Sequence, residues 1–544
     1  MPAPERTAND CTRRRNGDHA RARKARRPAK QVRRRISVHA LVRRPATAVF
    51  ALLAATAPPT ARSEEIDHSA VLFVSSDIRG YLAPCGCTEA MRGGIDRAAE
   101  QIARARAANP FVLFIDGGDA LFSRRSLSAR EVPQEELKAR TIARALLASR
   151  LATRAVGELD EARGPRFRKS LQLPDQEYGS VRLFEQAGLK VAIVAAKNER
   201  ELLAASQRAR REGANFVSAL YYQPLEPAQR AASNPDLEVN VLFATRAADE
   251  MDGEDNRLVR TRVPVAGIQS KGRSLARVDI HFTRAGEPFA LQKTSQERER
   301  EISSLDERIE LLKRELNAPG LGEQIKELKR AKLAELIQRR EAIGSAPLPA
   351  EQGNLFAVRF IPLEPALPSN AAVKSLMDDY DRQVGLLNLA WAEKHGRDCP
   401  RAAKGQPAYT GNEACQGCHA EAFPVWDASK HAHAYQTLEK LGRQYDLNCI
   451  GCHVTGYDRP GGVCRVDKVK NRTSVGCESC HGPGSIHSED PDQTNVVVAR
   501  PGKADCVRCH NPENSPHFDF ASFLPQILGP GHLGQKTSTP PKTR

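Results

Sequence analysis

The chain of 544 residues is long enough for two or three domains, and its formal net charge of +16 raises the question of a nucleic-acid partner. The charge is concentrated at the start: residues 1–44 hold fifteen Lys and Arg against three Asp and Glu, so the other residues together carry only +4. This distribution leaves no basic face for nucleic acid in the rest of the chain, and we expect no nucleic-acid partner.

Residues 1–62 are expected to form a basic leader and signal peptide. An apolar run of about ten residues from Ala48 is followed by small residues, which is typical of a secretory signal and too short to span a bilayer. A twin-arginine-like signal, a later translation start and a disordered basic tail are the alternatives. No later segment approaches eighteen consecutive apolar residues. We therefore expect an exported protein without a transmembrane segment, in the periplasm of a Gram-negative bacterium or another exported location.

Residues 66–292 alternate between strand-like and helix-like patterns. Short apolar runs predict buried strands and amphipathic stretches predict helices, an alternation that is typical of an α/β layered sandwich. The strands are expected at 70–76, 111–116, 191–196 and 239–244, and the helices at 95–108 and 135–150.

The motifs of this domain, "FVSSDIRGYLAPCGC", "FIDGGDALF" and "AVGELDEARG", resemble those of calcineurin-type metallophosphatases related to bacterial 5′-nucleotidases. Such enzymes clamp two metal ions with Asp-x-His, Gly-Asp and Gly-Asn-His motifs and later histidines. Asp77 and Asp119 match this pattern. The other motif positions, where the family has Asn or His, hold Arg79, Glu158, Leu159 and Gly267. The resemblance therefore implies the fold, while the dinuclear phosphoesterase chemistry is the least favoured function.

Two cysteines one residue apart follow the first strand of this domain. Cys85 and Cys87 could react as a redox pair, bind a soft metal or be structural, and the nearby Arg79 and Arg92 would favour the thiolate form. Some relatives of this nucleotidase-like group place redox-active cysteine near this point. The resemblance thus implies thiol redox catalysis at Cys85 and Cys87.

Residues 293–345 are dense in Glu, Lys, Arg and Leu and are expected to form a coiled-coil-like helical hairpin that breaks at "NAPG", 317–320. The hairpin could pack on the body of the protein or act as a dimerisation arm. Its first apolar stripe consists of Ile302, Leu305, Ile309, Leu312 and Leu316, and its second of Ile325, Leu328, Leu336 and Ile343.

A linker and a helix from about Ala371 to Lys394 are expected within 346–408, and a disordered tail at 536–544. Outside the repeated motifs described next, Cys399 and Cys464 are left over. In an oxidising compartment these two cysteines could form a disulfide.

The region 409–535 contains the pattern C-x-x-C-H four times, whereas the composition of the chain would supply about 0.01 copies by chance. C-x-x-C-H is the attachment signature of c-type haem, in which two thiols form thioethers and the adjacent imidazole binds the iron. Zinc sites and disulfides are the alternatives, but zinc does not require a His after every second Cys. We therefore expect four c-type haems in a mainly α-helical domain packed around them. The thioether cysteines would be Cys415, Cys418, Cys449, Cys452, Cys477, Cys480, Cys506 and Cys509, and the proximal ligands His419, His453, His481 and His510.

Histidines are also the candidates for the second axial ligands, because no Met lies beyond Met377. Five further histidines for four iron faces favour mostly bis-histidine coordination and low redox potentials. They are His431, His433, His487, His517 and His532.

Over roughly 409–520, "YTGNEACQGCHAEAFPVWDASKHAHAYQTL", "CIGCHVTGYDRPGGV" and "VGCESCHGPGSIH" are similar to tetrahaem cytochromes of the cytochrome c-554 type. The resemblance implies that the distal ligands are His431, His487 and His517, with His433 and His532 as alternates, and that one haem can be five-coordinate. An electron carrier with redox partner proteins in the cell envelope is the favoured function. The alternatives are an oxidoreductase acting at an open haem or at the Cys85 and Cys87 thiols, and a phosphoesterase fused to a cytochrome.

Overall fold

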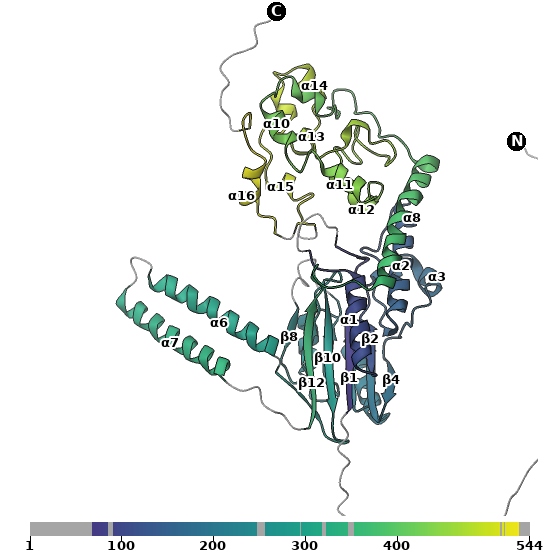
Figure 1. Ribbon diagram of the computed structural model, residues 1–544, viewed down its shortest axis with the longest axis vertical. Coiled ribbons are helices and arrows are strands. Elements are labelled where there is room, and N and C mark those ends of the chain that lie inside the picture. The colour runs from purple at the N-terminus through teal and green to yellow at the C-terminus, as the bar shows by residue number, and fades with distance from the viewer. Residues whose placement is uncertain are drawn as a thin grey trace, which may run out of the picture. The chain divides into compact units, whose positions relative to one another are not determined.

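The computed structural model describes residues 68–84, 91–246, 256–293, 295–317, 322–345, 353–511, 514–515 and 517–532. Up to residue 395 these residues form two six-stranded sheets with covering helices, and from residue 409 onward they form short helices joined by loops (Figure 1). The predicted fold class, an α/β layered part followed by a mainly helical part, is confirmed.

The first sheet has the strand order β11-β12-β10-β1-β2-β3. Strands β1, β2 and β3 run parallel, whereas β10 is antiparallel to both β1 and β12. The parallel strands therefore end at the same edge of the sheet. Their bounds are β1 His68–Ser75, β2 Val112–Asp116, β3 Leu151–Arg154, β10 Ser274–Phe282, β11 Phe289–Leu291 and β12 Asn354–Pro362.

The second sheet has the order β4-β5-β6-β7-β9-β8, with β5, β6, β7 and β9 parallel to one another. Its strands are β4 Ser180–Gln186, β5 Leu189–Ala196, β6 Phe216–Tyr221, β7 Val241–Ala244, β8 Arg257–Val259 and β9 Val265–Gly267.

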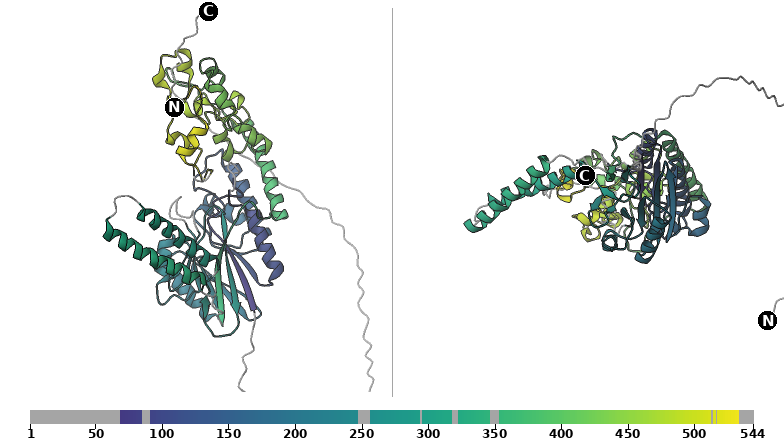
Figure 2. Two further views of the ribbon diagram at one scale, coloured as in Figure 1. Left: turned by 60° about the vertical axis from the view of Figure 1, so that its left-hand side comes forward. Right: turned by 90° about the horizontal axis from the view of Figure 1, so that it is seen from below.

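The alternation of side chains along β1 shows how the layers pack. Phe73 joins a core formed with α1 (Ile95–Ala108), α2 (Val132–Ala148) and α8 (Ala371–His395), whereas Leu72 points to the opposite face, where the two sheets meet. Helices α4 (Glu199–Arg211) and α5 (Leu225–Ala232) cover the outer face of the second sheet. The result is a four-layer sandwich of helices, sheet, sheet and helices (Figure 2).

The four strands and two helices expected from sequence correspond to β1, β2, β5, β7, α1 and α2. The other strands of the two sheets were not predicted, and one of them falls where a linker was expected. Residues 346–408 were expected to hold only a linker and a helix, but β12 pairs with β10 along its whole length and completes the first sheet. The hairpin of residues 293–345 thus lies between two strands of this sheet. Because β12 follows the hairpin, it is far in sequence from its partner β10, and the sequence pattern does not connect the two.

The hairpin consists of α6 (Ser295–Leu316) and α7 (Glu323–Ser345), which lie side by side (Figure 1). Leu305, Ile309 and Leu336 form its small core. The second predicted stripe is wrong in its first half, because Ile325 and Leu328 are 53% and 76% exposed. Lys329 already pairs with Glu315, next to the end of α6, so the earlier residues of α7 have no helix opposite them.

Helix α8 confirms the predicted helix and belongs to two cores. Its first half packs on the α/β part through Met377 and Val384, and Ala392 near its end joins a second core with Ile450 and Val463. The Cys399–Cys464 disulfide, with a Cα–Cα distance of 5.1 Å, ties the chain just after α8 to this second core. The remaining helices are α3 Gly164–Ser170, α9 Glu413–Gln416, α10 Ala422–Asp427, α11 Ala434–Lys440, α12 Leu447–His453, α13 Cys477–His481, α14 Ser485–Glu489, α15 Lys503–Cys506 and α16 Phe520–Phe523.

Candidate functional site

The C-x-x-C-H segments lie on or next to short helices, α9, α12, α13 and α15. In the first and last segments the backbone N–H of the histidine donates to the carbonyl of the first cysteine, at 2.9 Å for His419 and 2.8 Å for His510. One helical turn therefore brings the two thiols and the imidazole to the same side, as attachment to a single porphyrin requires. None of the eight cysteines of these motifs takes part in a disulfide.

Two of the proximal histidines have their imidazoles oriented by backbone carbonyls. His453 Nδ1 lies 2.6 Å from the carbonyl oxygen of Ala434, and His481 Nδ1 lies 2.7 Å from that of Val498. Because a carbonyl oxygen can only accept, Nδ1 carries the proton and Nε2 keeps its lone pair. This is the arrangement that metal-binding histidines use in proteins.

Two pairs of histidine rings from separate segments face each other. The ring centres of His419 and His487 are 6.3 Å apart, and those of His431 and His510 are 6.1 Å apart. Two imidazoles that share one metal ion, with metal–nitrogen bonds of about 2 Å, have ring centres roughly 6 Å apart. Burial, together with the neighbouring ring, lowers the pKa of His419 and of His431, which favours the neutral, ligating form.

The other candidate distal ligands are placed differently. The side chains of His433 and His517 are exposed. His532 lies near two proximal histidines, since burial and then the charges of His481 and His419 lower its pKa. The structure therefore brings His431 and His487 to the motif histidines. His433, His517 and His532 are all exposed, and of these three His532 lies near His481 and His419.

A buried carboxylate that sequence reasoning missed lies inside the third motif. Glu478 accepts hydrogen bonds from the backbone N–H groups of Thr410, Gly411 and Gly484. It thereby fixes the start of the first motif's segment to the turn that leads into His487. Glu478 occupies one of the two variable positions between Cys477 and Cys480, so the motif assigns it no role. Its negative charge was the one feature of the sequence that could have indicated a function.

The zinc alternative can be compared with the same geometry. Within the part of the chain that the structure describes, no group of three or more His, Cys, Asp or Glu side chains is arranged to hold a metal ion. The donor groups that the structure brings together are pairs: imidazoles, and the thiols of Cys415 with Cys477 and of Cys452 with Cys509.

The second candidate site lies at the ends of the parallel strands of the α/β part. Asp77 and Arg79 follow β1, and Asp119 follows β2; all three have positive φ angles of 52–54°, a conformation that costs energy for non-glycine residues. Burial raises the pKa of Asp77, an effect that Arg79 opposes by donating from Nε to Asp77 Oδ1 at 2.7 Å. Arg79 therefore stands where the motif would have a histidine, and its guanidinium already donates a hydrogen bond to the Asp77 carboxylate.

Asp119 also has protein partners. Its carboxylate accepts from the Tyr222 hydroxyl at 2.6 Å and from the backbone N–H of Leu159 at 2.7 Å. Burial, reinforced by the nearby Asp160, raises the pKa of Asp119 to about 6. Glu158 pairs with Arg125.

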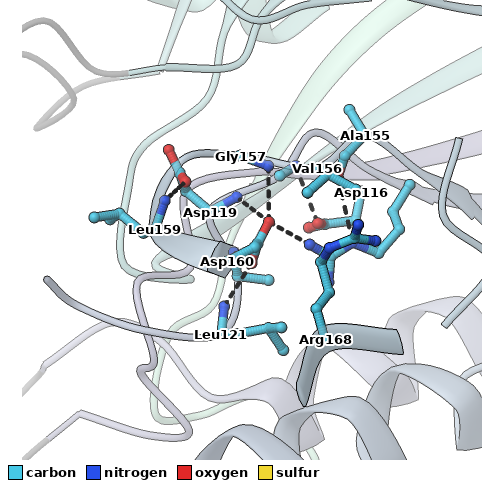
Figure 3. A network of polar contacts seen from close by, with 12 residues as sticks. Asp116, Asp119, Leu121, Ala155, Val156, Gly157, Leu159, Asp160 and Arg168 are labelled. Carbon is cyan, nitrogen blue, oxygen red and sulfur yellow. Dashed lines mark hydrogen bonds and ion pairs between the residues drawn. The ribbon is translucent and has the colours of Figure 1, made fainter. Parts of the chain in front are cut away.

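Below these residues lies a buried ionic network that sequence reasoning missed (Figure 3). Asp160 accepts from the backbone N–H groups of Asp119, Leu121 and Gly157 and forms an ion pair with the fully buried Arg154. The network holds the loops after β2 and β3 together through protein charges alone. Cys85 and Cys87, the proposed thiol pair, lie outside the described residues; Arg92 pairs with Glu364.

Comparison with known proteins assigns a family to the segment that contains the first three motifs. Residues 414–482 match the cytochrome c554 and c-prime family. The cytochrome c554-like segment is also similar to cytochrome c-554 of Nitrosomonas europaea, with 31% identity over 156 residues. That alignment covers 22% of this chain and 66% of the relative, slightly less than two thirds of its length. The match implies covalently bound c-type haem in this part of the chain, while the fourth motif, at 506–510, lies beyond the family match.

Several solved structures of hydrolases are similar to the chain. A 5′-nucleotidase precursor of Thermus thermophilus has a TM-score of 0.38 and 12% identity over 63% of this chain and 61% of that one. The sulfate thiohydrolase SoxB of the same organism has 0.37 and 13% over 67% and 69%. The calcineurin-like phosphoesterase YfkN of Bacillus subtilis has 0.32 and 14% over 41% and 88%. Within the described residues, no helix combines the length and hydropathy needed to cross a membrane.

Proposed function

We propose that the protein is an exported electron-transfer protein with four covalently attached haems, one for each C-x-x-C-H motif. The observation that carries this proposal is the pairing of imidazoles from separate segments at 6.1 and 6.3 Å between ring centres, a spacing suited to one iron between each pair. The cytochrome c554-like segment supports covalent haem at the first three motifs.

Each residue then has a role that follows from its place. The eight motif cysteines form the thioethers, and His419, His453, His481 and His510 are the proximal ligands. His487 completes the coordination of the iron held by His419, and His431 that of the iron held by His510. His532 is the next candidate: it is exposed, as His517 and His433 are, but it lies near His481.

The haems supply one-electron chemistry when bound, and the chain determines their surroundings. The carbonyls of Ala434 and Val498 orient two proximal imidazoles and increase their basicity, which favours the ferric state and a low potential. Four haems attached within about a hundred residues are necessarily close neighbours, and redox partner proteins of the cell envelope would deliver and collect the electrons.

For the α/β part we propose a role without phosphoester hydrolysis. A two-metal centre needs free carboxylates and imidazoles, whereas Asp77 is engaged by Arg79 and Asp119 by Tyr222. Thiol redox chemistry at Cys85 and Cys87 is the remaining proposal for this part.

The haem count of exported protein tests the main proposal. A pyridine haemochrome assay combined with intact mass should give four haems per chain, and electron paramagnetic resonance should show low-spin iron for at least the two paired sites. A colourless protein or a bare polypeptide mass would refute haem attachment. A count of three haems per chain would contradict haem attachment at one motif, and the fourth, which lies beyond the family match, would be the first to be excluded.

A pair of variants tests the assigned distal ligand. His487→Ala should convert one low-spin signal into a high-spin one at an unchanged haem count, whereas His281→Ala, at an exposed position on β10, should change nothing. An unchanged spectrum for His487→Ala would contradict its assignment. A high-spin component in the unmodified protein would favour the alternative of an oxidoreductase that acts at an open haem.

A further inference from the structure

A buried polar cluster joins the α/β part to the helix that carries the second motif. The Gln134 side chain of α2 donates to Asp446 at 2.6 Å and accepts from the backbone N–H of Leu447 at 3.0 Å. It also accepts from Asn388 of α8 at 2.6 Å. Asp446 is the N-cap of α12, since its carboxylate accepts from the backbone N–H of Asn448 at 2.9 Å.

The next residues of α2 extend this cluster. Glu135 accepts from Lys138 Nζ at 2.7 Å and from the Asn448 side chain at 3.3 Å. Asp446, Glu135 and Lys138 are only 5%, 4% and 8% exposed. Three ionisable side chains have therefore been removed from water at the base of the second haem-binding helix, where their charges act over short range with little screening.

The charges of the cluster do not balance. Glu135 and Asp446 bring two carboxylates, and Lys138 is the cation that pairs with Glu135 and acts on Asp446 through its charge. Arg443, the other nearby cation, is engaged by Asp381 at 2.9 Å. With both carboxylates ionised, the cluster therefore carries one buried negative charge.

Burial raises the pKa of Asp446, and hydrogen bonds from Asn448 and Gln134 and the charges of Lys138 and Arg443 only oppose this effect. Tyr380 of α8 faces the same cluster, because burial and then the charges of Asp446, Glu135 and Cys449 raise its pKa well above the ordinary value. Tyr380 therefore stays neutral. Among the described residues, Glu135 Oε2 has no hydrogen-bond partner, so the cluster offers an acceptor for one more proton.

The second haem site would adjoin this cluster. Asp446 lies three residues before Cys449, and its backbone carbonyl accepts from the Cys449 N–H at 3.0 Å. A ferric haem centre carries one positive charge that its ferrous form lacks. The oxidised haem therefore compensates the buried negative charge, and reduction removes that compensation.

On the basis of the haem attachment proposed above, we propose that reduction of the haem held by Cys449 and Cys452 is coupled to the uptake of one proton by the cluster of Glu135, Lys138 and Asp446. An external reductant supplies the electron, which reduces the iron from the ferric to the ferrous state. A proton from solvent binds the Asp446 carboxylate, so the charge around the haem changes little. The α/β part thereby takes part in setting one haem potential.

Spectroelectrochemical titration of the full haem-loaded protein between pH 5.5 and 8.5 tests this coupling. One haem potential should fall as pH rises, by at most about 59 mV per pH unit, the one-electron constant for a tenfold change. Asp446→Asn keeps the cap and its hydrogen bonds but not the charge. It should remove the slope from that haem alone at an unchanged haem count.

Two further variants fix the sign and the location. Lys138→Met removes the cation that stabilises the carboxylates, so the pH range of the slope should move upward. Asp458→Asn removes the partner of Arg130 at the same junction but on its exposed side, and the slope should remain. Proton uptake on reduction, followed with an indicator dye in weak buffer, gives a second measurement that requires no variant.

The coupling is refuted if Asp446→Asn has the same slopes as the unmodified protein, or if every potential of the unmodified protein is independent of pH. Reduction of fully loaded protein without proton uptake would refute it equally. A protein without haem at the second motif would instead refute the proposed function, and the haemochrome count distinguishes the two failures.

Discussion

Arg154 heads the largest fully buried side chains of the described residues, although it is charged. It pairs with Asp160 and lies 3.4 Å from Asp175, and the attraction of these carboxylates outweighs burial and raises its pKa. Asp160 in turn holds the backbone of the loops after β2 and β3 (Figure 3). Arg154 therefore compensates the buried acidic groups at the ends of the parallel strands.

Removing that cation should be costly. Arg154→Leu leaves Asp160 and Asp175 without their shared partner, and breaking a buried pair from one side typically costs about 3–5 kcal/mol. The urea midpoint of the transition of the α/β part should fall accordingly. Arg168→Leu is the matched control, because Arg168 pairs with Asp175 from a partly exposed position and should cost about 1 kcal/mol or less. Equal losses for the two variants would contradict the role given to Arg154.

At the residue scale the sequence predicted chemistry where spacing defines it. The C-x-x-C-H motifs predict which thiols and imidazoles act together, because those of one motif share a helical turn. The roles of Glu478 and Arg154 could not be predicted, because only the folded chain brings their partners close. Glu478 binds backbone N–H groups and Arg154 binds carboxylates. Between His517 and His532 the sequence offered no distinction, since both are exposed and only the fold places His532 near His481.

At the scale of elements, the hairpin of α6 and α7 is an insertion between neighbouring strands. β11 and β12 are parallel, so a connection must cross back over the sheet, which takes about a dozen residues or more. The hairpin supplies far more than that length and has a small core of its own. Apolar periodicity predicted the two helices of the hairpin. It gave no indication of β12, because the partner strand β10 lies before the insertion.

Replacing residues 294–352 with a flexible linker of about fourteen Gly and Ser residues should leave the α/β part folded. Its two strands remain connected, and a surface loop costs little in closure entropy. The melting temperature and the haem count should be close to those of the intact chain. Light scattering on both proteins also tests the dimerisation expected as one role of the arm: a dimer that becomes a monomer would support it, and two monomers would contradict it. Collapse of the whole sandwich would show that the hairpin is not a separate element.

At the scale of the whole molecule, α8 and the polar cluster around Gln134 link the two parts of the chain. Because α8 contributes Val384 to one core and Ala392 to the other, neither core can lose this helix without consequence for its neighbour. Gln134 adds three hydrogen bonds at the junction: those with Asp446 and Asn388 are buried, and the one from the Leu447 N–H is partly buried. The two parts should therefore unfold together in the intact protein.

Gln134→Leu should separate the two transitions. The substitution keeps much of the side-chain volume but removes one hydrogen bond each from Asp446, the Asn388 amide and the Leu447 N–H. We expect a cost of about 1–3 kcal/mol for a buried group left unsatisfied. Scanning calorimetry of the haem-loaded full chain should then resolve two transitions in place of one. Arg130→Ala is the control, because it removes an ion pair to the half-exposed Asp458 at the edge of the same junction and should keep a single transition. A single transition in both variants would mean that the contacts which neither substitution removes, α8 and the hydrogen bond from Asn448 to Glu135, are enough to couple the parts.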